Sequence, residues 1–285
     1  MMLHVATVHW RTARWIDPQL RYLARYLPAP FRVYAFLNGV RGDQAGKFFY
    51  SSTEPIEDHE TKLDVLADVI RCNASAADDV MVFVDGDAFP VAPVAPLLAE
   101  RLERHRLIAV KQFENNGDVQ PHPCFCVTTV GLWHDLGATW QRGHAWLDLR
   151  GKPVTDVGGN LLKALEEAQV DWYPLVRVNR RDLHPVLYGL YGDDVHGAVV
   201  YHHGGAFRHG LMRIDSLRPE LIAAYNRRGS RLARRLPKRG VAGAVRERLD
   251  PERRLRRRLV REVARDGDRI LARIERDEEF WSELL

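Results

Sequence analysis

The chain has 285 residues, which is enough to bury a complete hydrophobic core in one large domain or in a domain with an appendage. Its apolar fraction of 46% and net charge of +4 are ordinary for a soluble protein, and no apolar run approaches the length of a transmembrane helix. The three cysteines, Cys72, Cys124 and Cys126, exclude a disulfide framework. Since the N-terminus lacks the features of a signal peptide, we expect a cytoplasmic protein.

Strands and helices alternate in the first part of the chain. Apolar spacing predicts, in order, a strand at 3–10, a helix from Asp17-Pro18, a strand at 31–40, a loop at 41–57 and a helix that Asp58 caps. Alternation of this kind implies right-handed crossovers and a mainly parallel sheet with helices against it.

The next strand is the most informative stretch. Val80–Val84 is an apolar run without a polar break, which is typical of a strand buried on both faces. It ends in Asp85-Gly86-Asp87. Ligands of open α/β sheets bind at the carboxyl ends of strands, and paired carboxylates there can hold a divalent cation and, through it, a diphosphate. Gly86 has no side chain, so we expect a phosphate to approach the backbone there.

This stretch and its flanks resemble the D-x-D signature of GT-A-type glycosyltransferases, over roughly residues 3–210. The resemblance implies a GT-A-like, Rossmann-type mixed sheet flanked by helices, a nucleotide-sugar donor, and Mn²⁺ or Mg²⁺ held by Asp85 and Asp87. It also implies that Thr7, His9, Asn38, Lys62 and Gly86 bind the donor. Three of them have a structural alternative: Thr7 as a strand residue, Asn38 as a turn residue and Lys62 as a solvated helix residue.

The middle region is expected to form the acceptor site. A strand at 107–113, a polar loop and the strand-like CFCVTTVGLW follow the D-x-D motif, and Cys124 and Cys126 should point to opposite faces. In the resemblance His122, Trp133 and Trp140 face a saccharide or lipid-linked acceptor. The alternative for the tryptophans is the hydrophobic core.

Asp156 precedes an amphipathic helix, in the order Thr155-Asp156-Val157-Gly158-Gly159-Asn160. The resemblance implies that Asp156 is the catalytic base of an inverting enzyme, which takes the proton of the acceptor hydroxyl. Alternatively, Asp156 or Thr155 simply caps the helix. A retaining enzyme needs no such base, and the sequence leaves the stereochemistry open.

Residues 184–197 are expected to form a turn-rich loop with exposed acids at Asp193 and Asp194. The last strand-like segment, Val199–Tyr201, then leads into His202 and His203. Many metal-dependent GT-A enzymes complete the metal site with a late histidine. Neighbouring residues of an extended chain point in opposite directions, so we expect one of the two to be a ligand, without deciding which. Arg208 is expected to pair with the donor phosphates.

From residue 217 the chain is rich in arginine with apolar residues at helical intervals, so we divide it into a GT-A-like catalytic domain at 1–216 and a basic helical extension at 217–285. Residues 227–265 contain 16 basic and 4 acidic side chains, a net of +12, against 26 and 34 in the remainder, a net of −8. Such a segment favours an anionic partner, and we expect peripheral attachment at the inner face of the membrane.

Two other classes of function remain open. Haloacid-dehalogenase-type phosphatases also place D-x-D after a buried strand, but usually near the N-terminus and followed by Thr, where this chain has Ala88-Phe89-Pro90. A nucleic-acid binder using the basic extension would leave the first 210 residues unexplained, so we do not expect nucleic acid. The donor sugar, nucleotide and acceptor are not determined by the sequence.

Overall fold

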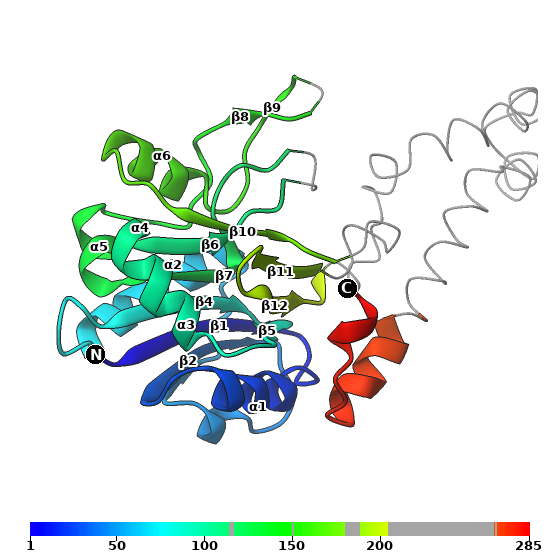
Figure 1. Cartoon of the computed structure of the whole chain (residues 1–285). Helices are drawn as coiled ribbons and strands as arrows, with labels where there is room; N and C mark the ends of the chain where they lie inside the picture. Colours follow the sequence, from blue (N-terminus) through cyan, green and yellow to red (C-terminus); the bar gives the residue numbers. More distant parts are fainter. Residues whose placement is uncertain (114–116, 150, 180–188, 205–264, 266) are drawn as a thin grey trace, which may run out of the picture. The chain divides into compact units, whose positions relative to one another are not determined.

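The computed structural model describes residues 1–113, 117–149, 151–179, 189–204, 265 and 267–285 (Figure 1). The chain divides into two compact units, and we describe each by itself. The first comprises Met1–Gly204 together with Phe280–Leu285, and the second Gly205–Glu279. The domain boundary expected at residue 216 lies outside the described residues.

A ten-stranded mixed sheet organises the first unit, in the order β3-β2-β1-β4-β7-β6-β10-β11-β12-β5. Strands β3, β2, β1 and β4 are parallel, β7 is antiparallel to both neighbours, β6 is parallel to β10, and β10 to β5 pair antiparallel. The strands are β1 Leu3–Trp10, β2 Phe31–Asn38, β3 Tyr50–Ser52, β4 Val80–Asp85, β5 Ala88–Pro90, β6 Leu107–Val110, β7 His122–Thr129, β10 Tyr173–Arg177, β11 Gly189–Asp193 and β12 Gly197–His202. The expected fold class, a mixed sheet flanked by helices, is confirmed.

Helices pack on both faces of this sheet (Figure 1). They are α1 Ile16–Tyr26, α2 His59–Asn73, α3 Ala95–Leu97, α4 Glu103–His105, α5 Val130–Asp135 and α6 Gly159–Glu167, with the 3₁₀ turns η1 Ala45–Lys47 and η4 Trp281–Glu283 and the π-helical turn η2 Leu98–Leu102. A small hairpin of β8 Trp146–Leu147 and β9 Pro153–Val154 precedes α6.

Three local expectations were wrong. The N-cap of α1 is Trp15 and not Asp17, which lies in the first turn. Strand β3 forms within the expected loop at 41–57, because its backbone pairs with the edge of β2. Asp193, expected to be exposed, is buried, because its carboxylate accepts hydrogen bonds from the Tyr173 hydroxyl at 3.0 Å and from the His196 backbone N–H at 2.6 Å.

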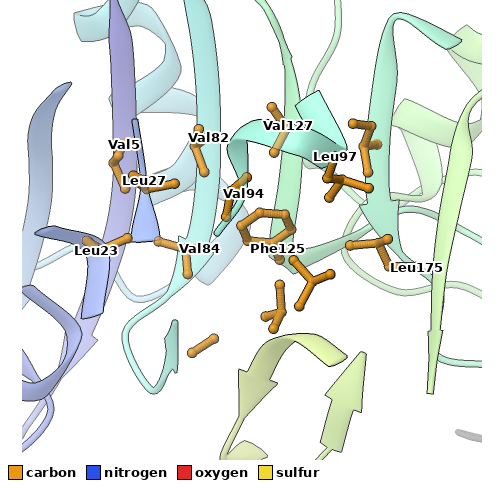
Figure 2. Packing of buried hydrophobic residues seen from close by; sticks show 14 of the residues in the cluster. Val5, Leu23, Leu27, Val82, Val84, Val94, Leu97, Phe125, Val127 and Leu175 are labelled. Atoms are coloured by element: carbon orange, nitrogen blue, oxygen red, sulfur yellow. The ribbon is translucent and has the colours of Figure 1, made fainter. Parts of the chain in front are cut away.

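Strand β4 is buried on both faces, as its sequence predicts. Val80, Val82 and Val84 belong to the cluster that Figure 2 shows, where Leu23 and Leu27 from the α1 region and Phe125 from β7 pack against them. Met81 and Phe83 belong to the opposite cluster, together with α2, α5 and α6. Cys124 and Cys126 also divide between the two clusters, as expected, because the register of β7 against β6 shifts between Cys126 and His122. The strand that carries the D-x-D motif is therefore held from both sides.

The end of the chain contributes to the same unit. Phe280 is buried, with its ring centroid 4.8 Å from that of Tyr201 on β12, 6.2 Å from Phe89 on β5 and 6.5 Å from Tyr22 on α1. Strand β5 directly follows Asp87, and β12 contains His202. Phe280 thus packs on the two strands that adjoin two of the candidate metal ligands.

We expect Phe280→Ala to destabilise the protein by about 3 kcal/mol or more, because the change leaves a cavity among Tyr22, Phe89 and Tyr201. Thermal unfolding measures the loss. Leu285→Ala is the control, because Leu285 is 48% exposed in the same segment. Equal midpoints for Phe280→Ala and the wild type would show that the ring cluster does not support this unit.

Among the described residues of the second unit, 267–275 are helical, with Ile270, Leu271 and Ile274 buried. Residues 217–264 and 266 of the expected basic extension lie outside the described residues. In the part of the chain that is described, no helix combines the length and the apolar character that crossing a bilayer requires.

Candidate metal centre

Strand pairing brings together residues that are far apart in the sequence. Asp85 is the last residue of β4, and Asp87 directly precedes β5. Strand β5 pairs antiparallel with β12, and His202 lies opposite Ala88. One ligand atom from each of Asp85, Asp87 and His202 lies within 4.8 Å of the others, and all three residues are half-buried. Among the described residues, these three form the group of His, Cys, Asp or Glu side chains whose ligand atoms lie close enough together to hold a metal ion.

Only one of the two adjacent histidines joins this group. His202 Nε2 lies 3.5 Å from Asp85 Oδ2 and 3.5 Å from Asp87 Oδ1. His203 is buried, with Nδ1 2.6 Å from the Tyr201 hydroxyl and its ring 4.6 Å from the Trp15 ring. Its backbone N–H donates to the Asp87 carbonyl at 3.0 Å. The structure thus places His202 with the carboxylates and His203 in an aromatic environment.

A residue that the sequence did not indicate completes the surroundings of Asp85. His59, the first residue of α2, places Nε2 3.1 Å from Asp85 Oδ1. Burial would raise the pKa of Asp85, but the hydrogen bond and charge of His59, with the charge of His202, hold it well below the usual range. Asp85 is therefore ionised, as a metal ligand must be. No periodic or motif signal distinguishes His59 from other residues at a helix start.

The charge of the group also acts on His202. Burial disfavours the imidazolium, but the attraction of Cys124 and then Asp87 raises the pKa of His202 well above its ordinary value. Burial raises the pKa of the Cys124 thiol itself, so we assign the attraction mainly to the carboxylate. Gln112, also missed in the sequence, places Nε2 3.4 Å from His202 Nδ1 and 3.7 Å from Cys124 Sγ.

His122 lies at the start of β7, with its ring centroid 6.0 Å from that of His202. The Cys124 backbone N–H donates to His122 Nδ1 at 3.1 Å, so a neutral ring carries its proton on Nε2. Burial lowers the pKa of His122 to about 4, against the opposing charges of Asp85 and Asp156. His122 is thus a neutral hydrogen-bond donor in the neighbourhood of both carboxylates.

Asp156 lies between β9 and α6, where its side chain is 33% exposed. Oδ1 accepts a hydrogen bond from the Val157 backbone N–H at 2.9 Å and lies 3.9 Å from Arg142 Nη2. The N-cap of α6 is Gly158, whose φ of 89° favours glycine, and no side chain caps the helix. The alternative in which Asp156 caps α6 is therefore wrong.

The packing of the D-x-D turn against β1 requires a glycine at position 86. A Cβ at this position would lie 2.4 Å from the Val8 carbonyl oxygen and 2.8 Å from His9 Nδ1. This close approach to β1 is enough to explain why glycine separates the two acids. The expectation that Gly86 admits a phosphate stays a prediction.

Two residues expected to bind the donor, Thr7 and His9, are buried on β1, the strand that pairs with β4. Thr7 is fully buried, and its hydroxyl donates to Gln19 Oε1 at 3.0 Å. His9 is 2% exposed, and burial lowers its pKa to about 4, against the charge of Asp87 and a hydrogen bond with Gln19. Both lie close to the D-x-D turn, and their direct contact with a donor stays a prediction.

The two other donor candidates are engaged with the loop before α2. Asn38 Nδ2 donates to the carbonyls of Glu54 at 3.2 Å and Ile56 at 3.1 Å. Lys62 is 2% exposed, and Nζ donates to the Glu57 carbonyl at 3.1 Å. Burial lowers the pKa of Lys62. In the structure both side chains hold the 54–57 segment.

The tryptophans expected to face an acceptor lie in the core. Trp133 is 6% exposed, and its ring lies 4.7 Å from Phe83 and 5.6 Å from Trp140. Trp140 is fully buried. Both rings are therefore part of the hydrophobic core, as the structural alternative predicts. Arg208 lies outside the described residues.

No protein-family model matches the chain, and no curated protein matches its sequence. Solved structures do match it. "S. aureus TarS 1-349" is 13% identical over 97% of this chain and 92% of that one, with a TM-score of 0.42. "S. aureus TarS" is 14% identical, with a TM-score of 0.36, over 50% of this chain and 30% of that one.

A third match is to a glycosyltransferase. "Glycosyltransferase GlyE in Streptococcus pneumoniae TIGR4" is 9% identical over 60% of this chain and 44% of that one, with a TM-score of 0.35. The chain thus spans less than half the length of this structure and of the longer TarS structure. TM-scores this low do not indicate what the chain does.

Proposed function

We propose that this protein is a metal-dependent glycosyltransferase that moves a sugar from a nucleotide-sugar donor to an acceptor. The observation that carries the proposal is the convergence of Asp85, Asp87 and His202 at the carboxyl end of a buried strand. Ligands of open α/β sheets bind at this edge. The convergence depends on the β5–β12 pairing, so it is not a property of a short acidic turn alone.

The three side chains suit a divalent cation. Two carboxylates supply the hard oxygen ligands that Mg²⁺ and Mn²⁺ prefer, and the imidazole suits a first-row transition metal such as Mn²⁺. His202 Nε2 is 3.5 Å from an oxygen of each acid, so the three donors face one location. A bound cation would supply Lewis-acid stabilisation of the leaving nucleoside diphosphate.

The chain's own residues have distinct proposed roles. Asp85, Asp87 and His202 bind the cation, and His59 orients Asp85 through the contact between Nε2 and Oδ1. Asp156 takes the proton of the acceptor hydroxyl if the reaction inverts the sugar configuration.

Within the same proposal, His122 donates a hydrogen bond from Nε2 to a ligand between the metal group and Asp156. Its neutral state and its tautomer, set by the Cys124 backbone N–H, support this role.

The phosphatase alternative is less well supported. There Asp85 would be the nucleophile, but its Oδ1 is 3.1 Å from His59 and its Oδ2 is 3.5 Å from His202. Two imidazoles stabilise its negative charge and reduce its reactivity toward a phosphoryl group. The anionic membrane and nucleic-acid partners depend on the basic segment at 227–265, which is almost wholly outside the described residues.

Calorimetric titration with uridine and guanosine diphosphates tests the proposal. We expect one of them to bind in the presence of Mn²⁺ and to lose at least about tenfold in affinity in EDTA, about 1.4 kcal/mol. The bound nucleotide should also raise the unfolding temperature, because ligands stabilise the state that they bind. Equal affinity in Mn²⁺ and in EDTA would remove the cation from the proposal.

A further inference from the structure

Helix α1 places one polar side chain on its buried face. Gln19 is fully buried, as are Ile16, Tyr22 and Leu23 of the same helix. Burying an amide without hydrogen-bond partners is unfavourable, so the hydrogen bonds of the Gln19 side chain must offset the loss of its contacts with water. A hydrophobic residue would fit the buried face of α1 without this desolvation cost. The groups that Gln19 binds therefore indicate why an amide is present there.

The Gln19 amide binds both ends of the D-x-D turn. Nε2 donates to the carbonyl of Asp85 at 2.7 Å and to the carbonyl of Ala88 at 2.8 Å. Oε1 accepts from the Thr7 hydroxyl at 3.0 Å. Because the two carbonyls can only accept, the orientation of the amide is determined by chemistry.

These bonds restrain the backbone on both sides of Gly86 and Asp87. Between the two carbonyls lie Gly86 and Asp87, and glycine has more conformational freedom than any other residue. Glycine is required there because of the close approach to the Val8 carbonyl. The Asp87 carbonyl is bound separately by the His203 backbone N–H at 3.0 Å. Gln19 thus limits the turn that sets the separation of the two carboxylates.

We propose that Gln19 is a positioning residue that holds Asp85 and Asp87 at the separation needed to bind the divalent cation. This inference rests on the proposed metal site, and Gln19 itself contacts neither carboxylate oxygen in the hydrogen bonds described. It acts through the backbone carbonyls of Asp85 and Ala88. The competing account is that Gln19 is a satisfied buried amide that contributes to stability alone.

Gln19→Met distinguishes the two accounts, because methionine is similar in size but cannot bridge the carbonyls. We expect Mn²⁺ affinity, measured on the full chain by electron paramagnetic resonance without nucleotide, to fall by about 10- to 100-fold, as for other residues that support metal ligands. Amide hydrogen exchange should become faster in the peptide that contains residues 85–88.

Asp79→Asn is the matched control. Asp79 is also buried, lies just before β4 at its opposite end, and accepts backbone hydrogen bonds from Met2, Ser75 and Ala76 at 2.7, 2.9 and 3.2 Å. Its replacement should lower the unfolding temperature and speed exchange around residues 75–79, with Mn²⁺ affinity unchanged. A stability effect alone therefore cannot account for a loss of metal affinity in Gln19→Met.

Thr7→Val is a milder variant that tests the positioning role of Gln19 if Gln19→Met does not fold. It removes only the bond to Gln19 Oε1, so we expect a smaller loss of Mn²⁺ affinity in the same direction. Wild-type Mn²⁺ affinity in these variants would overturn the positioning role while leaving the metal site standing. Failure of the wild type itself to bind Mn²⁺ would overturn the proposed function, and the role of Gln19 with it.

Discussion

Replacing Asp87 with asparagine is expected to lower Mn²⁺ affinity by more than about 100-fold, since even outer-shell partners of a metal are worth 10–100-fold. Asn has nearly the same shape, so the change removes a negative charge and a ligand oxygen from the group without creating a cavity. Mn²⁺ titration followed by electron paramagnetic resonance measures the effect.

Three variants make this result specific. Asp68→Asn removes a carboxylate that is 74% exposed on α2 and should leave Mn²⁺ affinity unchanged. His202→Gln should weaken binding, whereas His203→Gln should mainly lower the unfolding temperature, because His203 binds the Tyr201 hydroxyl. Stronger loss of Mn²⁺ binding in His203→Gln than in His202→Gln would contradict the ligand assignment.

Replacing Asp156 with asparagine is expected to reduce sugar transfer by about 100-fold or more if Asp156 is the base, while Mn²⁺ and nucleotide binding stay intact. Asparagine retains an oxygen that can accept the 2.9 Å hydrogen bond from the Val157 backbone, so the loop should keep its conformation. The measurement is release of nucleoside diphosphate from the nucleotide-sugar donor, with a panel of saccharide and lipid-linked acceptors.

Thr155→Val is the control for the loop. Thr155 Oγ1 accepts from the Gly143 backbone N–H at 3.0 Å, so its loss should lower stability without reducing turnover to the same degree. Normal turnover with a reduced unfolding temperature in Asp156→Asn would show that Asp156 has a structural role. A retaining mechanism would give the same normal turnover, because it requires no base.

Local patterns in the sequence were sufficient for the centre of the sheet. The unbroken apolar run at Val80–Val84 predicted burial on both faces, because only a central strand has two apolar sides to fill. Cys124 and Cys126 were correctly expected in separate core clusters, but the two-residue period of a strand is not the reason, because it puts residues two apart on the same face. The separation comes from the irregular register of β7 against β6 between Cys126 and His122, which only the tertiary structure shows. The position of Asp85 and Asp87 at the end of a buried strand followed from the same run.

The partners of these acids depended on contacts between distant segments. Alternation showed that His202 and His203 point in opposite directions, but the face toward Asp87 is determined by the register that pairs His202 with Ala88. His59 reaches Asp85 because α2 packs against β1 and β4. Neither relation leaves a signal in the sequence near the residues concerned.

The sequence by itself therefore determined the fold class, the buried strand and the location of the paired acids, because each depends on a period or a run of neighbouring residues. The tertiary structure alone decided that His202 joins the acids, that Trp133 packs in the core and that Gln19 binds the Asp85 and Ala88 carbonyls. Gln19 shows the reason most clearly. One glutamine in an amphipathic helix looks like a surface residue, and only the turn packed beneath it provides the acceptors for its amide.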